Sequence, residues 1–93
     1  MTMDKNDLAD IIDDSAYMVV LATNELLIKP GTYWITNRNL GWPVNLGDTF
    51  SIKNIDTNEE QVVDFNRFAE HMPSRDFNVY IGDLLLSYEL WES

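Results

Sequence analysis

The carboxylates of Asp7, Asp10 and Asp14 recur at the spacing of one face of an α-helix. Residues three and four apart on a helix are neighbours, with side chains roughly 5–6 Å apart. Nucleic acid presents phosphates on a comparable scale, with about one charge per 1.7 Å of duplex axis. These acids therefore predict a surface that substitutes for nucleic acid in the basic groove of a partner. Three further carboxylates are candidates for the same role: Asp13, Glu59 and Glu60.

Trp42 stands apart from the other large aromatic residues, most of which a domain of this size needs in its core. It lies between Gly41 and Pro43 in a polar stretch. Tryptophan is enriched among the residues that dominate the binding energy of protein interfaces. One interpretation is therefore an exposed anchor for a partner. The alternative, which is the more common fate of such a ring, is a lid folded over the core.

The chain has few groups for catalysis or metal binding. It contains no cysteine and a single histidine, His71, which we expect at the surface near the end of a short helix. A zinc site or an activated nucleophile needs several such groups to converge. No phosphate-binding glycine loop, nucleophile elbow or zinc-binding histidine motif occurs, and residues 56–60 lack the spaced ligands of a calcium loop. We expect no enzymatic activity, no metal and no cofactor.

The balance of charges limits the partners of the protein. Six lysines and arginines face sixteen acids in 93 residues, so the formal net charge is −10. Proteins bind nucleic acid and anionic lipid through lysine and arginine, and here the basic residues are scattered along the chain. We therefore expect no direct binding to nucleic acid or to membranes, and a basic protein surface as the complementary partner. Acidity that serves only solubility is the alternative.

In size and charge the chain is similar to two kinds of small acidic protein. One is the phage-encoded nucleic-acid mimic that blocks host defence or transcription enzymes. The other is the bacterial immunity protein or antitoxin that covers a basic nuclease site. The sequence thus predicts a small acidic inhibitor of a basic, nucleic-acid-acting protein. A second class stays open, a structural or assembly module that associates through a sheet edge and apolar surface.

The first element expected to position the acidic residues is a helix over residues 3–15. Thr2 or Asp4 can serve as its N-cap, and apolar residues recur along it at helical spacing. Asp13 and Asp14 fall near its C-terminal end, where the helix dipole disfavours negative charge. This placement is a local inconsistency, which indicates either a functional site or a helix end that frays.

The rest of the chain has the patterns of a sheet. Tyr17 to Ala22 is a continuous apolar run, typical of a strand buried on both faces. Pro30-Gly31 favours a type II turn that folds residues 26–29 and 32–36 back on each other. A polar loop with Trp42 is expected over residues 37–45. Further strands are expected at 49–55, 60–65, 77–81 and 84–91, the last of which also fits a helix.

Together these patterns predict one α+β domain over residues 1–93. It has an N-terminal helix, a mainly antiparallel sheet of about five or six strands, and a short helix near residues 66–72. The longest apolar run is too short to cross a bilayer, and the N-terminus lacks the pattern of a secretory signal. The sequence therefore predicts a cytoplasmic protein.

Overall fold

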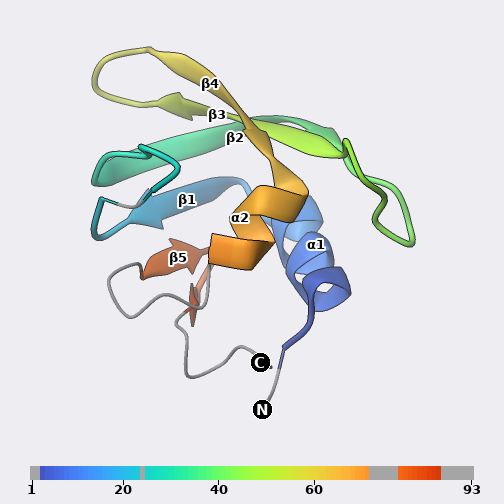
Figure 1. Cartoon of the computed structure of the whole chain (residues 1–93). Coiled ribbons are helices and arrows are strands. Elements are labelled where there is room, and N and C mark those ends of the chain that lie inside the picture. Colours follow the sequence, from blue (N-terminus) through green and yellow to red (C-terminus); the bar gives the residue numbers. More distant parts are fainter. Residues whose placement is uncertain (1–2, 24, 72–77, 87–93) are drawn as a thin grey trace.

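The computed structural model describes residues 3–23, 25–71 and 78–86, which form a six-stranded sheet and two helices (Figure 1). The helices are α1 (Lys5–Asp14) and α2 (Phe65–His71). The strands are β1 (Tyr17–Val20), β2 (Gly31–Asn39), β3 (Thr49–Asn54), β4 (Glu60–Asp64), β5 (Val79–Ile81) and β6 (Leu84–Leu86). They follow the order β4-β3-β2-β1-β5-β6, and every neighbouring pair is antiparallel. The predicted α+β fold is confirmed.

Helix α1 begins at a capping box. Asp4 is the N-cap residue, and its Oδ1 accepts a hydrogen bond from the backbone N–H of Asp7 at 3.0 Å. In return, Oδ2 of Asp7 accepts from the N–H of Asp4 at 3.3 Å. These bonds satisfy donors that the first helical turn leaves unpaired. At the other end the hydroxyl of Ser15 donates to the carbonyl of Ile11 at 2.6 Å, so side chains close both ends of the helix.

Both helices pack against one face of the sheet, and none of the described helices covers the other face (Figure 1). Burial along β1 alternates accordingly. Met18 and Val20 are buried beneath the helices, whereas Tyr17 and Val19 are only half-buried on the opposite face. The prediction that this strand is buried on both faces is therefore wrong. Among the described residues, no helix is long and apolar enough to cross a membrane.

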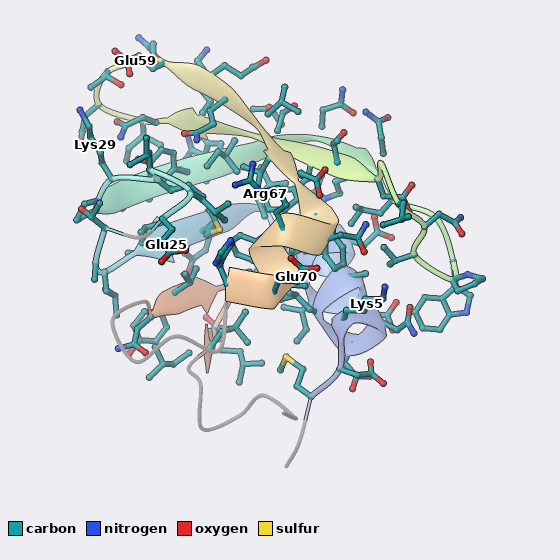
Figure 2. All side chains as sticks on the ribbon, viewed as in Figure 1. Lys5, Glu25, Lys29, Glu59, Arg67 and Glu70 are labelled. Carbon is teal, nitrogen blue, oxygen red and sulfur yellow. The ribbon has the colours of Figure 1, made fainter. Side chains whose placement is uncertain are left out.

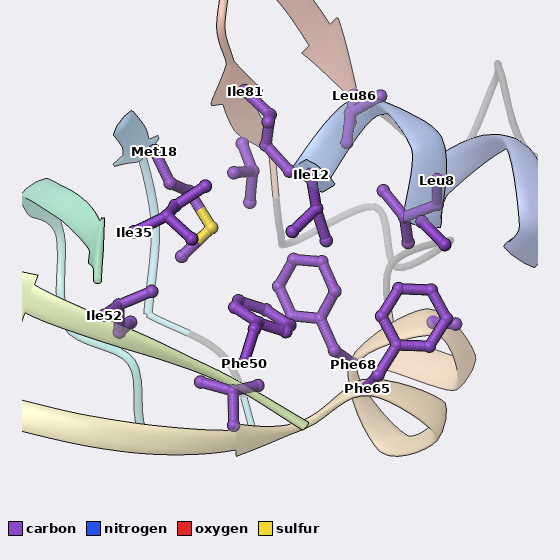
Figure 3. Packing of buried hydrophobic residues seen from close by; sticks show 14 of the residues in the cluster. Leu8, Ile12, Met18, Ile35, Phe50, Ile52, Phe65, Phe68, Ile81 and Leu86 are labelled. Carbon is purple, nitrogen blue, oxygen red and sulfur yellow. The ribbon is translucent and has the colours of Figure 1, made fainter. Parts of the chain in front are cut away.

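The core between sheet and helices is centred on three phenylalanines (Figure 3). Phe50 of β3 contacts Phe65 and Phe68 of α2 edge to face, with ring centroids 6.4 and 5.3 Å apart. All three rings are fully buried, as are Leu8 and Ile12 of α1. Edge-to-face aromatic pairs contribute about 0.5–1.5 kcal/mol beyond the area that they bury. The packing of α2 onto β3 is therefore a major source of stability.

Residues 21–30 connect β1 to β2, and those described form no strand. The predicted hairpin at Pro30-Gly31 is wrong, because Gly31 has a φ of 154° and begins β2. A type II turn needs a φ of about +80° at that position. The apolar residues that suggested a strand at 26–29 instead place Ile28 in the hydrophobic core. β2 pairs with β1, with Trp34 opposite Tyr17.

The ends of some strands differ from the predicted ranges, and others lie outside the described residues. β2 extends to Asn39 past an irregularity between Ile35 and Asn37, so the loop that carries Trp42 begins later than predicted. The turn at Gly82, which has a φ of 61°, leads into β6, so the strand alternative for the last segment is confirmed for residues 84–86. The predicted strand residue Phe77 and the remainder of that last segment, residues 87–91, lie outside the described residues.

Candidate functional site

The structure divides the predicted acidic residues into two groups at opposite ends of the molecule. One group is exposed on α1 and consists of Asp7, Asp10, Asp13 and Asp14. Glu59 and Glu60 are exposed in the hairpin between β3 and β4. Figure 2 shows Glu59 at that hairpin, far from Lys5 on α1. A single acidic surface cannot include both groups, and the α1 group is the larger.

The loop between β2 and β3 brings Trp42 next to the acidic helix. Together with Asp10 and Asp13, Trp42 lines a shallow hollow of about 90 Å³. The Trp42 side chain is 68% exposed. The ring is therefore not a lid over the core. In the sequence Trp42 and the helix acids are separate candidates, and the tertiary structure makes them neighbours.

Asp48 organises the loop that presents Trp42. Its Oδ2 accepts hydrogen bonds from the backbone N–H groups of Gly41 at 2.8 Å and Asn45 at 2.9 Å. The bonds from Asn45 and Gly41 favour the charged carboxylate and lower the pKa of Asp48 below its ordinary value of 3.8. Asp48 directly precedes β3, and its side chain thus joins the end of the loop to Gly41 and Asn45 within it.

The same loop is also tied to both helices. The backbone N–H of Val44 donates to Oδ1 of Asn6 on α1 at 3.4 Å, and Val44 itself is buried. Nδ2 of Asn66 on α2 donates to the carbonyl of Asn45 at 2.8 Å. A loop fixed at several points loses less conformational entropy when a partner binds. Trp42 is therefore a preorganised exposed ring.

The four acids of α1 differ in what they already contact. The carboxylate of Asp7 belongs to the capping box, so part of its role is structural. For Asp10, Asp13 and Asp14, no basic side chain within the described part of the chain forms an ion pair. Their charges are therefore uncompensated locally. These three carboxylates are the ones available to a cationic partner.

Arg38 of β2 explains how α1 tolerates acids at its C-terminal end. Its Nε donates a hydrogen bond to the carbonyl of Ile12 at 2.9 Å, and its Nη2 donates to the carbonyl of Ser15. The guanidinium supplies the positive charge that the last turn of the helix lacks. Nothing in the sequence near Arg38 indicates this role, because 26 positions separate Arg38 from Ile12.

The open face of the sheet forms a second candidate surface. Trp34 is 49% exposed there, and its ring meets that of Tyr17 edge to face at 6.4 Å. Tyr80 lies opposite Val19 on one side and Leu85 on the other. The two-residue period of a strand was the signal for this face, since Tyr33 and Ile35 are buried and Trp34 between them is not.

His71 lies at the end of α2, as expected, and its Nδ1 is 3.4 Å from Oε2 of Glu25 in the loop before β2. This contact links the helix to the loop. Within the ranges that the structure describes, no three histidine, aspartate or glutamate side chains converge to hold a metal ion. The two candidate surfaces present carboxylates and exposed aromatic rings.

Comparison with protein-family models, curated proteins and solved structures finds no match to this chain.

Proposed function

We propose that the protein is a small acidic binding module that covers a basic, nucleic-acid-binding surface of a cytoplasmic partner. The observation that supports this proposal is the position of Trp42. The ring is exposed on a loop that hydrogen bonds hold in place, and it lies beside Asp10 and Asp13 of α1. A lysine or arginine over an indole gains about 0.5–1 kcal/mol at an exposed site. Neighbouring carboxylates attract the same cation. The patch thus suits a basic side chain that otherwise holds a phosphate.

In this proposal the protein acts as an inhibitor without catalysis, in the manner of phage anti-defence mimics, transcription inhibitors or nuclease immunity proteins. The formal net charge of −10 accelerates the approach to a basic partner through long-range attraction. The uncompensated carboxylates of α1 then occupy the sites at which the partner binds the phosphates of nucleic acid. Trp42 supplies the short-range contact that fixes the orientation of the complex.

Capture of partners from a host lysate across a salt series tests this function. We expect basic proteins to be retained at low salt, to be lost as salt rises, and to be released by duplex DNA or RNA. Trp42→Ala and the double change Asp10→Asn, Asp13→Asn should each abolish retention. Trp34→Ala is the matched control, since it removes an exposed indole from a different face. Retention that survives high salt and excess nucleic acid contradicts the proposal.

A second candidate function is an assembly module that associates through the open face of the sheet. The exposed Trp34, with Tyr80 and Leu85 on the same face, favours it, because contiguous exposed apolar patches mark interaction sites. A complex made through this face resists salt and is lost in Trp34→Ala while Trp42→Ala leaves it intact. The two candidates thus give opposite results in the same experiment.

The protein itself should not bind nucleic acid under either proposal. Its six lysines and arginines are outnumbered by sixteen acids, and too few cations are present to displace counterions from phosphates. We expect no shift of DNA or RNA in a gel at physiological salt. Salt-sensitive binding at micromolar concentration would contradict the mimic proposal.

A further inference from the structure

Among the described strands, β4 lies at one edge of the sheet and pairs with β3 alone. The carbonyl of Glu59 accepts from the N–H of Asn54 at 2.9 Å, and the N–H of Phe65 donates to the carbonyl of Asp48 at 2.9 Å. Backbone groups of an antiparallel strand point alternately toward one neighbour and away from it. Every second residue between these two contacts therefore directs its N–H and C=O away from β3. These residues are Glu60, Val62 and Asp64.

A groove lies beside this edge, between β4, α2 and the loop before β2. Its volume is about 340 Å³, and its lining includes Leu27 and Arg67. Figure 2 shows Arg67 on α2 and Glu25 on the loop at this side of the molecule. A neighbouring hollow of about 410 Å³ shares Leu27 and Gln61 with the groove. The two hollows therefore adjoin each other along β4.

Leu27 is held in an unusual conformation at the wall of this groove. Its φ is 58°, a left-handed value that residues with a side chain rarely adopt, and its side chain is 75% exposed. The side chain of Val62 in the middle of β4 is 67% exposed as well. Neither residue belongs to the hydrophobic core. A strand added at the β4 edge would contact both, because side chains of a strand alternate between its two faces.

Charge selects the kind of segment that fits. The acids around the groove and the adjoining hollow outnumber the cations. The acids are Glu25, Asp56, Glu59, Glu60 and Asp64, and the cations are Lys29 and Arg67. A second copy of the chain would bring a formal charge of −10 to a surface of the same charge. Charge complementarity therefore disfavours self-association at this edge and favours a segment that carries lysine or arginine.

We propose that the β4 edge binds an extended basic segment of a partner chain by strand addition. The segment pairs with the outward N–H and C=O groups of Glu60 and Val62 and with the N–H of Asp64, because the carbonyl of Asp64 serves the first turn of α2. Its apolar side chains lie over Leu27 in the groove, and its basic side chains lie on the other face beside Glu60 and Asp64. Backbone pairing supplies affinity in such complexes, and alternate side chains supply specificity. This surface is separate from the Trp42 patch and does not depend on the function proposed there.

A capped synthetic peptide of alternating lysine and valine, added to the isotope-labelled full chain, tests the proposal by NMR. We expect the amide signals of Leu27, Glu60, Val62 and Asp64 to shift. A peptide of alternating glutamate and valine is the charge control and should not bind.

Two pairs of variants sharpen the test. Val62→Pro removes an outward N–H that β3 does not use, so an edge strand tolerates it, and binding should weaken by about tenfold. Val62→Thr keeps the donor and should bind as the original chain does. Leu27→Gly removes the wall of the groove while suiting the left-handed backbone, and it should also weaken binding. Asn58→Gly, at the other left-handed residue, is its control.

The proposal is overturned if the lysine–valine peptide does not bind, or if Val62→Pro and Leu27→Gly bind it unchanged. It is also overturned if the shifts map to Trp42 or Trp34 and leave Glu60 and Val62 unchanged, or if the edge instead forms a dimer that Val62→Pro abolishes. Trp42→Ala should leave peptide binding intact. Failure of the edge proposal is therefore distinguishable from failure of the Trp42 patch.

Discussion

Nε of Arg38 donates a hydrogen bond to the carbonyl of Ile12 at 2.9 Å, and so a cation of β2 closes the C-terminal end of α1. The helix can then carry Asp13 and Asp14 in its last turn without a basic residue of its own. These acids stay unpaired by any described side chain. The fold thus stabilises an acidic helix end through one contact on its backbone and leaves the carboxylates free to attract a partner.

Arg38→Met tests this arrangement, because methionine keeps the apolar stem and removes both bonds. We expect a loss of about 1.5–3 kcal/mol in the free energy of unfolding, the range for hydrogen bonds to charged groups. The free energy of unfolding of Arg38→Lys should lie between those of Arg38→Met and the original chain, since lysine keeps the charge without the planar fork. Urea unfolding curves measure both changes. Equal stability of Arg38→Met and the original chain would show that α1 does not need this cap.

Asp48 predicts a pH dependence of stability with a defined sign. Its folded pKa lies below its ordinary value of 3.8, so the unfolded chain takes up this proton first as pH falls. Its contribution is complete above pH 3.8 and is lost as pH falls through the lower folded pKa. The difference in melting temperature between the original chain and Asp48→Asn should therefore be constant at neutral pH and shrink in acid. The other acids titrate in both proteins and cancel in this difference.

Trp42→Ala should have little effect on stability, because the ring is 68% exposed. We expect the melting temperature to stay within a few degrees of the original. Phe50→Ala is the contrasting variant, since Phe50 is fully buried and its loss should cost about 3–5 kcal/mol. In a domain of this size that cost lowers the melting temperature by more than about ten degrees. A large drop for Trp42→Ala would mean that the ring supports the fold.

Substitutions of Asp7 and Asp10 should distinguish an acid that stabilises the helix from an acid that binds a partner. Asp7→Ala removes half of the capping box and should cost about 0.5–1 kcal/mol of stability. Asp10→Ala removes an exposed acid with no described partner, and should leave stability unchanged or slightly higher while weakening capture of a basic partner. Thermal melts and the salt-dependent capture assay measure these two effects separately. Equal effects of both changes in both assays would show that the acids act only through total charge.

Most secondary structure was predictable because it depends on local spacing. The helix over 3–15, the short helix near 66–72 and the strands around Phe50 and Val63 follow from hydrophobic periodicity and turn residues. The strand expected at 26–29 fails for a tertiary reason. Ile28 enters the core from an irregular loop, and periodicity cannot distinguish a short apolar run in a strand from one in such a loop.

The sequence by itself determined the acidity of the protein, the α+β pattern of its elements and the candidate residues Trp42, Asp10 and Asp13. Only the tertiary structure decided that these three residues share one hollow, that Asp48 braces their loop, and that Arg38 closes the acidic helix. It also decided that the helices cover one face of the sheet and leave Trp34 exposed on the other. The physical reason is that spacing along the chain specifies local hydrogen bonds and the face on which a side chain lies. Contacts between residues tens of positions apart depend instead on which elements pack together, and burial of the whole core selects that packing.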